Sequence, residues 1–275
     1  MVVFPNCKIN LGLNILRKRS DGFHDLETIF HPLPFYDILE VIAPEKEPVN
    51  EFLFTTSGIT IDGHAENNLC VKAYHLLKKD FPKLSHLRIH LHKTIPSGAG
   101  LGGGSADAAF TLKLFNDKFH LNLSAGQLTS YALQLGSDCP FFIINKTCFA
   151  SGRGEILEPI HINLNRYKFV LINPGIPIHT AYAFSQITPA HPARPVNDII
   201  KQPVNEWKEQ LKNDFEEPVF KQYPEIKKIK DELYRAGAVY ASLSGSGSTV
   251  YGLFEKEKKA ELSFPSNYFV RESTG

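Results

Sequence analysis

PSGAGLGGGSADAA, residues 96–109, contains five of the chain's glycines and two serines. It follows an alternating segment at 87–92 and precedes an apolar run at 108–115, which predicts a strand, a glycine loop and the start of a helix. Because glycine tolerates a positive φ and lets the backbone approach a ligand, successive N–H groups of such a loop can face one anion. The helix N-terminus adds its unpaired amides and the positive end of its dipole. The stretch therefore predicts a phosphate-binding site.

The glycine spacing alone leaves several interpretations open. Gly98, Gly100 and Gly103 fit the GxGxxG pattern of dinucleotide-binding folds, with Asp117 as the acid that would bind a ribose. That interpretation needs the loop directly after its strand, whereas residues 93–96 intervene. A Walker loop is excluded because a serine, and not a lysine, follows the glycines. A glycine-rich surface turn without a ligand is the remaining alternative.

Length and composition favour a globular protein with no nucleic-acid or membrane partner. The chain has 275 residues, 43% of them hydrophobic, which is enough for one large or two ordinary cores. Its 30 Lys and Arg balance 29 Asp and Glu, so the net charge of +1 gives no electrostatic case for nucleic acid or an anionic membrane. We expect no nucleic-acid or membrane partner, and a monomer or homodimer.

The cysteines and the N-terminus bear on the compartment. Cys7, Cys70, Cys139 and Cys148 lie far apart without a CxxC pair, which favours reduced thiols over a zinc site or a disulfide framework. The first residues lack the basic start and long apolar core of a signal peptide, and no apolar run is long enough to span a membrane. These features predict a cytoplasmic protein.

The apolar periodicity predicts a mixture of strands and helices, which indicates an α+β fold. Strands are predicted at 2–4, 9–15, 38–42, 52–56, 141–144, 168–172, 239–243 and 249–254. Helices are predicted at 67–79, 124–135, 204–215 and 226–236, the second with a capping box formed by Ser124 and Gln127. A long proline-containing loop is predicted at 188–203, and a glycine turn at 244–248.

Three segments in collinear order resemble the GHMP kinase superfamily, which phosphorylates small molecules. They are PNCKINL at 5–11, the glycine stretch at 96–109 and LSGSGS at 243–248. Two further segments, RSDGFH at 19–24 and LGSDCP at 135–140, point to a branch of the family that acts on a cytidine diphosphate derivative. The motifs are specific jointly and not singly.

This resemblance implies the two-domain GHMP kinase fold of the α+β class, with the active site in the interdomain cleft. We expect an N-terminal ATP-binding domain at 1–160 and a C-terminal domain at 161–275 that contributes to the substrate site. The implied reaction moves the γ-phosphate of ATP to the 2-hydroxyl of a methylerythritol unit carried on a cytidine diphosphate, in the non-mevalonate pathway to isoprenoid (terpenoid) precursors. ATP would be the co-substrate, accompanied by Mg²⁺.

The resemblance places Lys8 and Asp138 at the reacting centre. Phosphoryl transfer depends on positioning and charge neutralisation, and a carboxylate can accept the proton of the attacking hydroxyl. Asp138 follows a predicted helix end and precedes Pro140, so we expect it to project from a short rigid loop. An adjacent lysine would keep the carboxylate ionised and stabilise developing negative charge. From the residues alone, a structural Lys–Asp salt bridge remains an alternative.

The nucleotide site implied by the resemblance centres on the glycine stretch. Its residues are Asn68, Lys93, Pro96, Gly98, Gly100, Leu101, Gly102, Gly103, Gly104 and Ser105. Asn68 and Lys93 would contact the adenine region; without the resemblance they would be an ordinary helix residue and a solvated lysine. The Ser105 hydroxyl can bind a phosphate or Mg²⁺, or cap the helix. Asp107 can also reach a metal, but an acid is favoured in the first helical turn in any case.

The acceptor site implied by the resemblance comes from both ends of the chain. Its residues are Asn10, Phe23, His24, Thr180, Phe184, Gly245 and Ser246. Phe23 would stack on the cytosine and His24 would hydrogen-bond its edge, although the family usually has Tyr at position 23, so a hydroxyl contact is lost. Tyr182 is a rival of Phe184 for the second aromatic role. The turn at 244–248 is, by itself, also an ordinary tight hairpin.

Two further functions stay open at this level. One is another kinase of the same superfamily, acting on homoserine or mevalonate, against which the segment at 21–24 argues. The other is a non-catalytic relative that kept the fold, against which the retained Lys8 and Asp138 argue.

Overall fold

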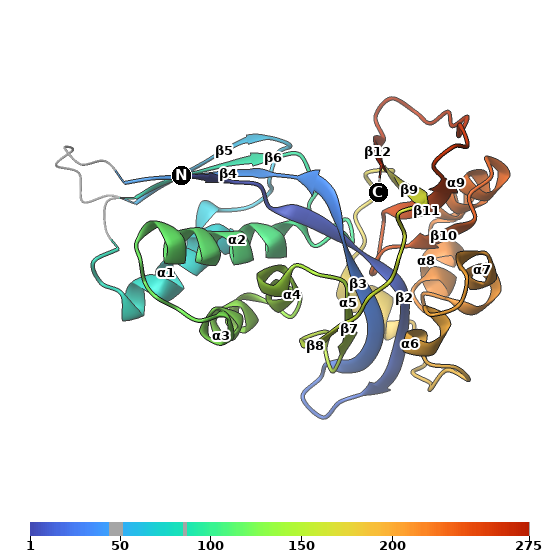
Figure 1. The fold of residues 1–275 in the computed structure, drawn as a ribbon, viewed down its shortest axis with the longest axis horizontal. Coiled ribbons are helices and arrows are strands. Elements are labelled where there is room, and N and C mark those ends of the chain that lie inside the picture. The colour runs from blue at the N-terminus through green and yellow to red at the C-terminus, as the bar shows by residue number, and fades with distance from the viewer. Residues whose placement is uncertain (44–51, 85–86, 275) are drawn as a thin grey trace. The chain divides into compact units, whose positions relative to one another are not determined.

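The structure, a computed structural model, describes residues 1–43, 52–84 and 87–274, and its contacts divide the chain into two compact units (Figure 1). Unit 1 consists of residues 1–7, 35–97 and 102–145, and unit 2 of residues 8–34, 98–101 and 146–275. The predicted boundary at residue 160 is a single division, whereas each of these units consists of three segments of the chain. The units alternate along the sequence because most of two long strands near the N-terminus and the middle of the glycine loop pack with the C-terminal half.

Unit 1 packs helices on one face of a four-stranded sheet (Figure 1). The strand order is β1 (Val2–Val3), β4 (Ile38–Ile42), β6 (Arg88–Lys93) and β5 (Leu53–Gly58), with β5 and β6 parallel and the other pairs antiparallel. The helices are η1 (Ala65–Asn67), α1 (Leu69–Asp80), α2 (Gly103–Lys118), α3 (Ala125–Leu135) and α4 (Cys139–Ile144). Alternate residues of β6 are buried, so its Ile89 and Leu91 pack in one core with α1 and α2.

Helix α3 begins as predicted, whereas α4 corrects a prediction. Ser124 and Gln127 form the expected capping box of α3. The strand predicted at 141–144 is wrong, because this segment is the helix α4. Pro140 lies in its first turn, where a missing N–H leaves no hydrogen bond unmade. A short apolar run does not distinguish a buried strand from a buried helix, and the proline was the signal that could have done so.

Unit 2 contains two four-stranded sheets and the remaining helices. One sheet has the order β2 (Asn6–Lys18), β3 (His24–Tyr36), β7 (Cys148–Ser151) and β8 (Ile156–Pro159), and the outer ends of its two long strands lie in unit 1. The other has the order β10 (Tyr240–Leu243), β11 (Val250–Glu255), β9 (Tyr167–Asn173) and β12 (Phe269–Thr274). The helices are α5 (Thr180–Ser185), α6 (Val196–Ile199), η2 (Val204–Glu206), α7 (Trp207–Gln210), α8 (Glu216–Gln222) and α9 (Pro224–Arg235).

The helix predicted at 204–215 is broken, which is a second correction. Its first part forms η2 and α7, and the chain then runs extended, so that Asn213 makes an isolated β-bridge with Leu13. The Asn213 side chain bonds to backbone groups outside any helix, a competition that disfavours Asn in helix interiors. The predicted loop at 188–203 also contains the short helix α6.

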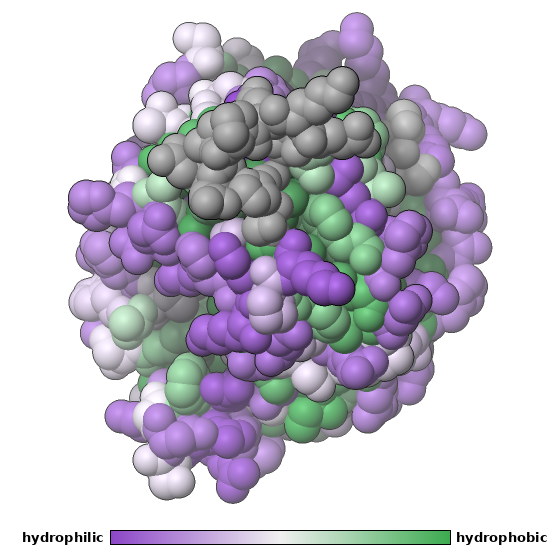
Figure 2. Space-filling view, turned by 90° about the vertical axis from the view of Figure 1, so that its left-hand side faces the viewer, coloured by the Kyte–Doolittle hydropathy of each residue, from purple (hydrophilic) through white to green (hydrophobic). Residues whose placement is uncertain are grey.

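The face seen in Figure 2 is mostly hydrophilic, with smaller hydrophobic areas between polar residues. Within the described ranges, none of the helices has the length and apolar character that a membrane span requires.

All four cysteines are free and buried. Burial raises the pKa of the Cys139 thiol to about 12 and that of Cys148 to about 11, so the reactive thiolate is scarce at neutral pH. We expect the native protein to react with none of the four thiols when Ellman's reagent is added at about pH 8, and with all four after unfolding in guanidinium chloride. The absorbance of the released thionitrobenzoate measures both. Fast reaction of one native thiol would show that a cysteine is exposed.

Candidate active site

The glycine stretch forms a loop between β6 and α2, as predicted. Gly98, Gly100 and Gly102 have φ values of 64°, 76° and 68°, a left-handed region that glycine enters without a steric penalty. Gly102 is the N-cap of α2, so the unpaired amides of the first helical turn follow the loop directly. Backbone N–H groups in such a turn, followed by a helix N-terminus, are typical of an anion site.

The middle of the loop, residues 98–101, is held by two other motifs within unit 2. The carbonyl of Leu101 accepts a hydrogen bond from the Lys8 amide at 2.9 Å. The carbonyl of Gly100 accepts from the Ser244 hydroxyl at 2.8 Å and from the Lys8 ammonium at 3.3 Å. The structure thus brings together all three segments on which the family resemblance rests.

Gly100 has no room for a side chain. A Cβ placed on it would lie 1.9 Å from the Ser244 carbonyl oxygen, which is part of the backbone. We expect Gly100→Val to raise the KM for ATP about tenfold or more, because a β-branched residue strains a positive φ and the loop must move. Steady-state kinetics measures this. Gly126→Ala on α3, where the nearest atom would be 4.0 Å away, is the control and should leave KM unchanged. An unchanged KM in the Gly100 variant would exclude the loop from ATP binding.

Lys8 lies on β2 with its side chain 3% exposed. Its ammonium lies 4.9 Å from the centre of the Phe30 ring and donates to Asn10 Oδ1 at 2.6 Å. A buried ammonium needs such partners, because burial without them is unfavourable by several kcal/mol. Two residues predicted separately, Lys8 for catalysis and Asn10 for the substrate, therefore lie in direct contact.

Asp138 lies in unit 1 at the N-cap of α4, half-buried, and its side chain does not cap the helix. Burial raises the pKa of the neighbouring Cys139 thiol, and the negative charge of Asp138 adds to this shift. Because Lys8 and Asp138 belong to different units, their pairing stays a prediction.

Lys93 is buried and forms ion pairs with two carboxylates. It is 2% exposed, and its ammonium contacts Asp37 Oδ2 at 2.5 Å and Asp107 Oδ2 at 2.8 Å. Asp37 Oδ1 accepts from the backbone amides of Thr94 and Ile95, where the glycine loop begins. We call Asp37, Lys93 and Asp107 the buried ion trio; the solvated alternative for Lys93 is wrong, and its contact with adenine stays a prediction.

The buried ion trio also bears on the metal. Asp107 is 2% exposed, and burial raises the pKa of its carboxyl while the neighbouring charge of Lys93 opposes this shift. Burial lowers the pKa of Lys93, but the two carboxylates outweigh this and the net shift is upward. Asp107 Oδ2 is thus a structural partner of Lys93, whereas the buried Asp107 Oδ1 has no hydrogen-bond partner among the described residues, so a metal role of Asp107 stays open. Among the residues that the structure describes, no group of three His, Cys, Asp or Glu side chains forms a metal site.

A hollow of about 200 Å³ lies in unit 1 between β5, η1 and the start of α1. Phe54, Ile61, His64 and Asn68 are among the residues that line it. The Asn68 side chain also caps α1 by accepting from the Cys70 amide at 2.9 Å. Polar side chains such as Thr56 and His64 line it beside the apolar ones, and the contact of Asn68 with the adenine region stays a prediction.

Four of the residues predicted for the acceptor site form two contacting pairs. The rings of His24 and Phe184 stack with centroids 4.8 Å apart, and the hydroxyls of Thr180 and Ser246 are 3.1 Å apart. Burial, aided by the Lys18 charge, lowers the pKa of His24, so its ring is neutral near pH 7 and can both donate and accept. Tyr182, the rival aromatic, is 46% exposed and lines a groove to which neither His24 nor Phe184 contributes.

Phe23 has a partner that sequence reasoning missed. It is 51% exposed, and the Arg153 guanidinium lies 4.6 Å from its ring centre. The turn GRGE at 152–155 gives no periodic signal that links it to residue 23, so only the fold places Arg153 there.

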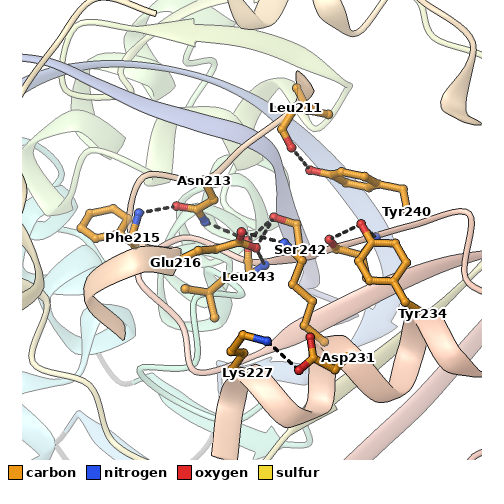
Figure 3. A network of polar contacts seen from close by, with 12 residues as sticks. Leu211, Asn213, Phe215, Glu216, Lys227, Asp231, Tyr234, Tyr240, Ser242 and Leu243 are labelled. Atoms are coloured by element: carbon orange, nitrogen blue, oxygen red, sulfur yellow. Dashed lines mark hydrogen bonds and ion pairs between the residues drawn. The ribbon is translucent and has the colours of Figure 1, made fainter. Parts of the chain in front are cut away.

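A polar network fixes the strand that leads into the 244–248 turn (Figure 3). Asn213 Nδ2 donates to the carbonyls of Leu243 and Gly245, each at 2.8 Å. Glu216 Oε1 accepts from the Ser242 hydroxyl and the Leu243 amide, each at 3.0 Å. The buried Asn213 and the partly buried Glu216 therefore hold this strand and the first residues of the turn, as a ligand-binding turn on a rigid support requires.

Comparison with known proteins gives two family models that match this chain. The model "GHMP kinases N terminal domain" matches residues 68–146, and the model "GHMP kinases C terminal" matches residues 198–263. The chain is 55% identical over 258 residues to a 4-diphosphocytidyl-2-C-methyl-D-erythritol kinase of Bacteroides thetaiotaomicron, covering 94% of this chain and 93% of that protein. It is 42% identical over 277 residues to the Porphyromonas gingivalis protein of the same name, covering 99% of each.

Solved structures agree with these relatives. A crystal structure of 4-(cytidine 5'-diphospho)-2C-methyl-D-erythritol kinase matches with a TM-score of 0.77 and 32% identity, covering 92% of this chain and 90% of that one. The mevalonate kinase of Methanococcus jannaschii matches with a TM-score of 0.68 and 14% identity, covering 94% and 92%, which shows a shared fold alone. The dinucleotide interpretation is thereby overturned, and Asp117 lies inside α2 and not after a strand.

Proposed function

The chain belongs to the GHMP kinase family, among its 4-diphosphocytidyl-2-C-methyl-D-erythritol kinases, and we propose that it transfers the γ-phosphate of ATP to the 2-hydroxyl of that cytidyl compound. The observation that carries the proposal is a set of three hydrogen bonds. The Lys8 ammonium donates to Asn10 Oδ1 and to the Gly100 carbonyl, and this carbonyl also accepts from the Ser244 hydroxyl. Three segments far apart in sequence converge there, as a phosphoryl-transfer site needs.

In the proposed reaction, loop amides hold the β- and γ-phosphates and Lys8 neutralises charge as it develops on the transferred group. Asp138 accepts the proton of the acceptor hydroxyl as the new O–P bond forms, and ADP departs with the electron pair of the broken bond. The burial of Lys8 supports this role, since a charge in a low-dielectric site acts more strongly on a nearby phosphate than one in water.

We propose that Mg²⁺ accompanies the nucleotide. Mg²⁺ keeps several waters and is usually bound through one or two side chains together with substrate phosphates, so a set of three protein ligands is unnecessary. The Ser105 hydroxyl, at the first turn of α2, is the side chain that would hold it. When bound, the ion would neutralise negative charge on the β- and γ-phosphates.

For the acceptor, we propose that Phe23 and the His24–Phe184 pair receive the cytosine, and that Thr180 and Ser246 bind polar groups of the ribose and diphosphate. The neutral His24 ring supports recognition of a base edge that presents both a donor and an acceptor. The free thiols support a reducing compartment, and we place the reaction in the cytoplasm, where ATP is available.

The proposal is tested by coupling ADP release to NADH oxidation with three acceptors, each supplied with ATP and Mg²⁺. We expect ADP release with 4-diphosphocytidyl-2-C-methyl-D-erythritol and none with homoserine, mevalonate or ATP alone. Phosphorus NMR should show one new phosphomonoester, bonded to the 2-position. Faster turnover with homoserine or mevalonate, or none with the cytidyl compound, would refute the proposed substrate.

A further inference from the structure

A directed chain of hydrogen bonds runs inward from Lys8 within unit 2. The Lys8 ammonium donates to Asn10 Oδ1 at 2.6 Å, and Asn10 Nδ2 donates to Thr28 Oγ1 at 3.0 Å. The Thr28 hydroxyl in turn donates to the carbonyl of Gly12 at 2.5 Å. Thr28 is 0% exposed and lies on β3, paired with Ala150 of β7.

The chemistry of each group fixes the direction of this chain. An ammonium and a backbone carbonyl stand at the two ends, and the first can only donate while the second can only accept. Because the Thr28 hydroxyl donates its one hydrogen to the Gly12 carbonyl, its oxygen must accept from the Asn10 amide nitrogen. The Asn10 oxygen is then turned toward Lys8.

The hydrogen bond with Thr28 fixes the orientation of the Asn10 side-chain amide. The backbone of Asn10 is held in β2, and the Tyr251 hydroxyl donates to its carbonyl at 2.7 Å. Rotation of the amide by half a turn would place an NH₂ group against an ammonium, which is repulsive. Bonds aligned in one direction also polarise one another, so each strengthens the next.

We propose that Thr28 is a positioning residue for phosphoryl transfer, which acts by orienting the Asn10 amide that holds the Lys8 ammonium. This inference rests on the proposed function. Neither the sequence motifs nor the family models include residue 28, since the matched ranges begin at 68 and 198.

The test compares Thr28→Val, which keeps the shape and removes the hydroxyl, with Thr28→Ser, which keeps the hydroxyl. We expect Thr28→Val to lower kcat about tenfold to hundredfold while the KM for ATP stays within about threefold, because a displaced ammonium affects the transition state more than nucleotide binding. Thr28→Ser should restore kcat to within about threefold of wild type. Thr111→Val removes another fully buried hydroxyl, bonded to the Asp107 carbonyl in α2, and should retain kcat.

Circular dichroism and a urea titration check that each variant is folded. Should Thr28→Val fail to fold, Thr28→Cys, with a weaker acceptor of similar size, takes its place and should lose kcat likewise. A folded Thr28→Val with wild-type kcat, or a Thr28→Ser as impaired as Thr28→Val, would overturn the inference. Failure of the proposed function is distinguishable, because it would appear as absent ADP release in the wild-type protein.

Discussion

Asp138→Asn is expected to keep the fold and to lower kcat by about 10²- to 10⁴-fold, the range of general acid–base contributions. Asn has the shape of Asp but cannot accept a proton from the acceptor hydroxyl. The Asp138 side chain does not cap α4, so its replacement should leave that helix intact. Steady-state rates with saturating ATP and cytidyl acceptor measure the loss, and the KM for ATP should change little.

The matched control is Asp117→Asn, at an exposed position of α2. Asp117 is the acid that a dinucleotide-binding interpretation required, so its replacement tests that interpretation as well. We expect wild-type kcat for this variant. Turnover of Asp138→Asn within a few-fold of wild type would remove Asp138 from the mechanism.

Lys93→Met is expected to lower the free energy of unfolding by about 3–5 kcal/mol, the usual effect of removing one partner from a buried ion pair. The Asp37 and Asp107 carboxylates would remain buried without their ammonium. Asp37 also accepts from the amides that open the glycine loop, so the damage should reach the loop as well. Urea titration followed by circular dichroism measures the stability.

Two comparisons make this prediction specific. Lys227→Met removes an exposed pair with Asp231 on α9, shown in Figure 3, and should change stability by less than about 1 kcal/mol. The triple variant Lys93→Met, Asp37→Asn, Asp107→Leu removes the buried charges together and should recover a large part of the loss. If Lys93→Met were no less stable than Lys227→Met, the buried ion trio would have no structural role.

Much of the fold could be predicted from local signals. The density of glycines at 96–109 predicts a loop there, and Ser124 and Gln127 indicate where α3 begins. Such signals lie within a few residues of the element they specify. The strand predicted at 141–144 and the helix predicted at 204–215 were wrong because apolar spacing alone does not determine the element. Pro140 favours a helix start at the first segment, and the side-chain hydrogen bonds of Asn213 disfavour a helix at the second.

Fewer residues of the candidate site could be predicted from the sequence, because some of them act through partners that are distant along the chain. Lys8 and Gly100 stand in motifs, so the family resemblance finds them. Thr28 and Asp37 act through partners that are distant in sequence, and an isolated Thr or Asp in a strand or turn carries no pattern. Their roles appear only when the strands are paired.

The most direct measurement is a crystal structure of the protein with a non-hydrolysable ATP analogue, Mg²⁺ and the cytidyl acceptor. We predict that the amides of the glycine loop contact the β- and γ-phosphates, and that Lys8 Nζ and an Asp138 oxygen both lie within about 3.5 Å of the acceptor 2-hydroxyl or the γ-phosphate. A triphosphate bound away from residues 98–105, or an acceptor hydroxyl remote from both side chains, would contradict the account.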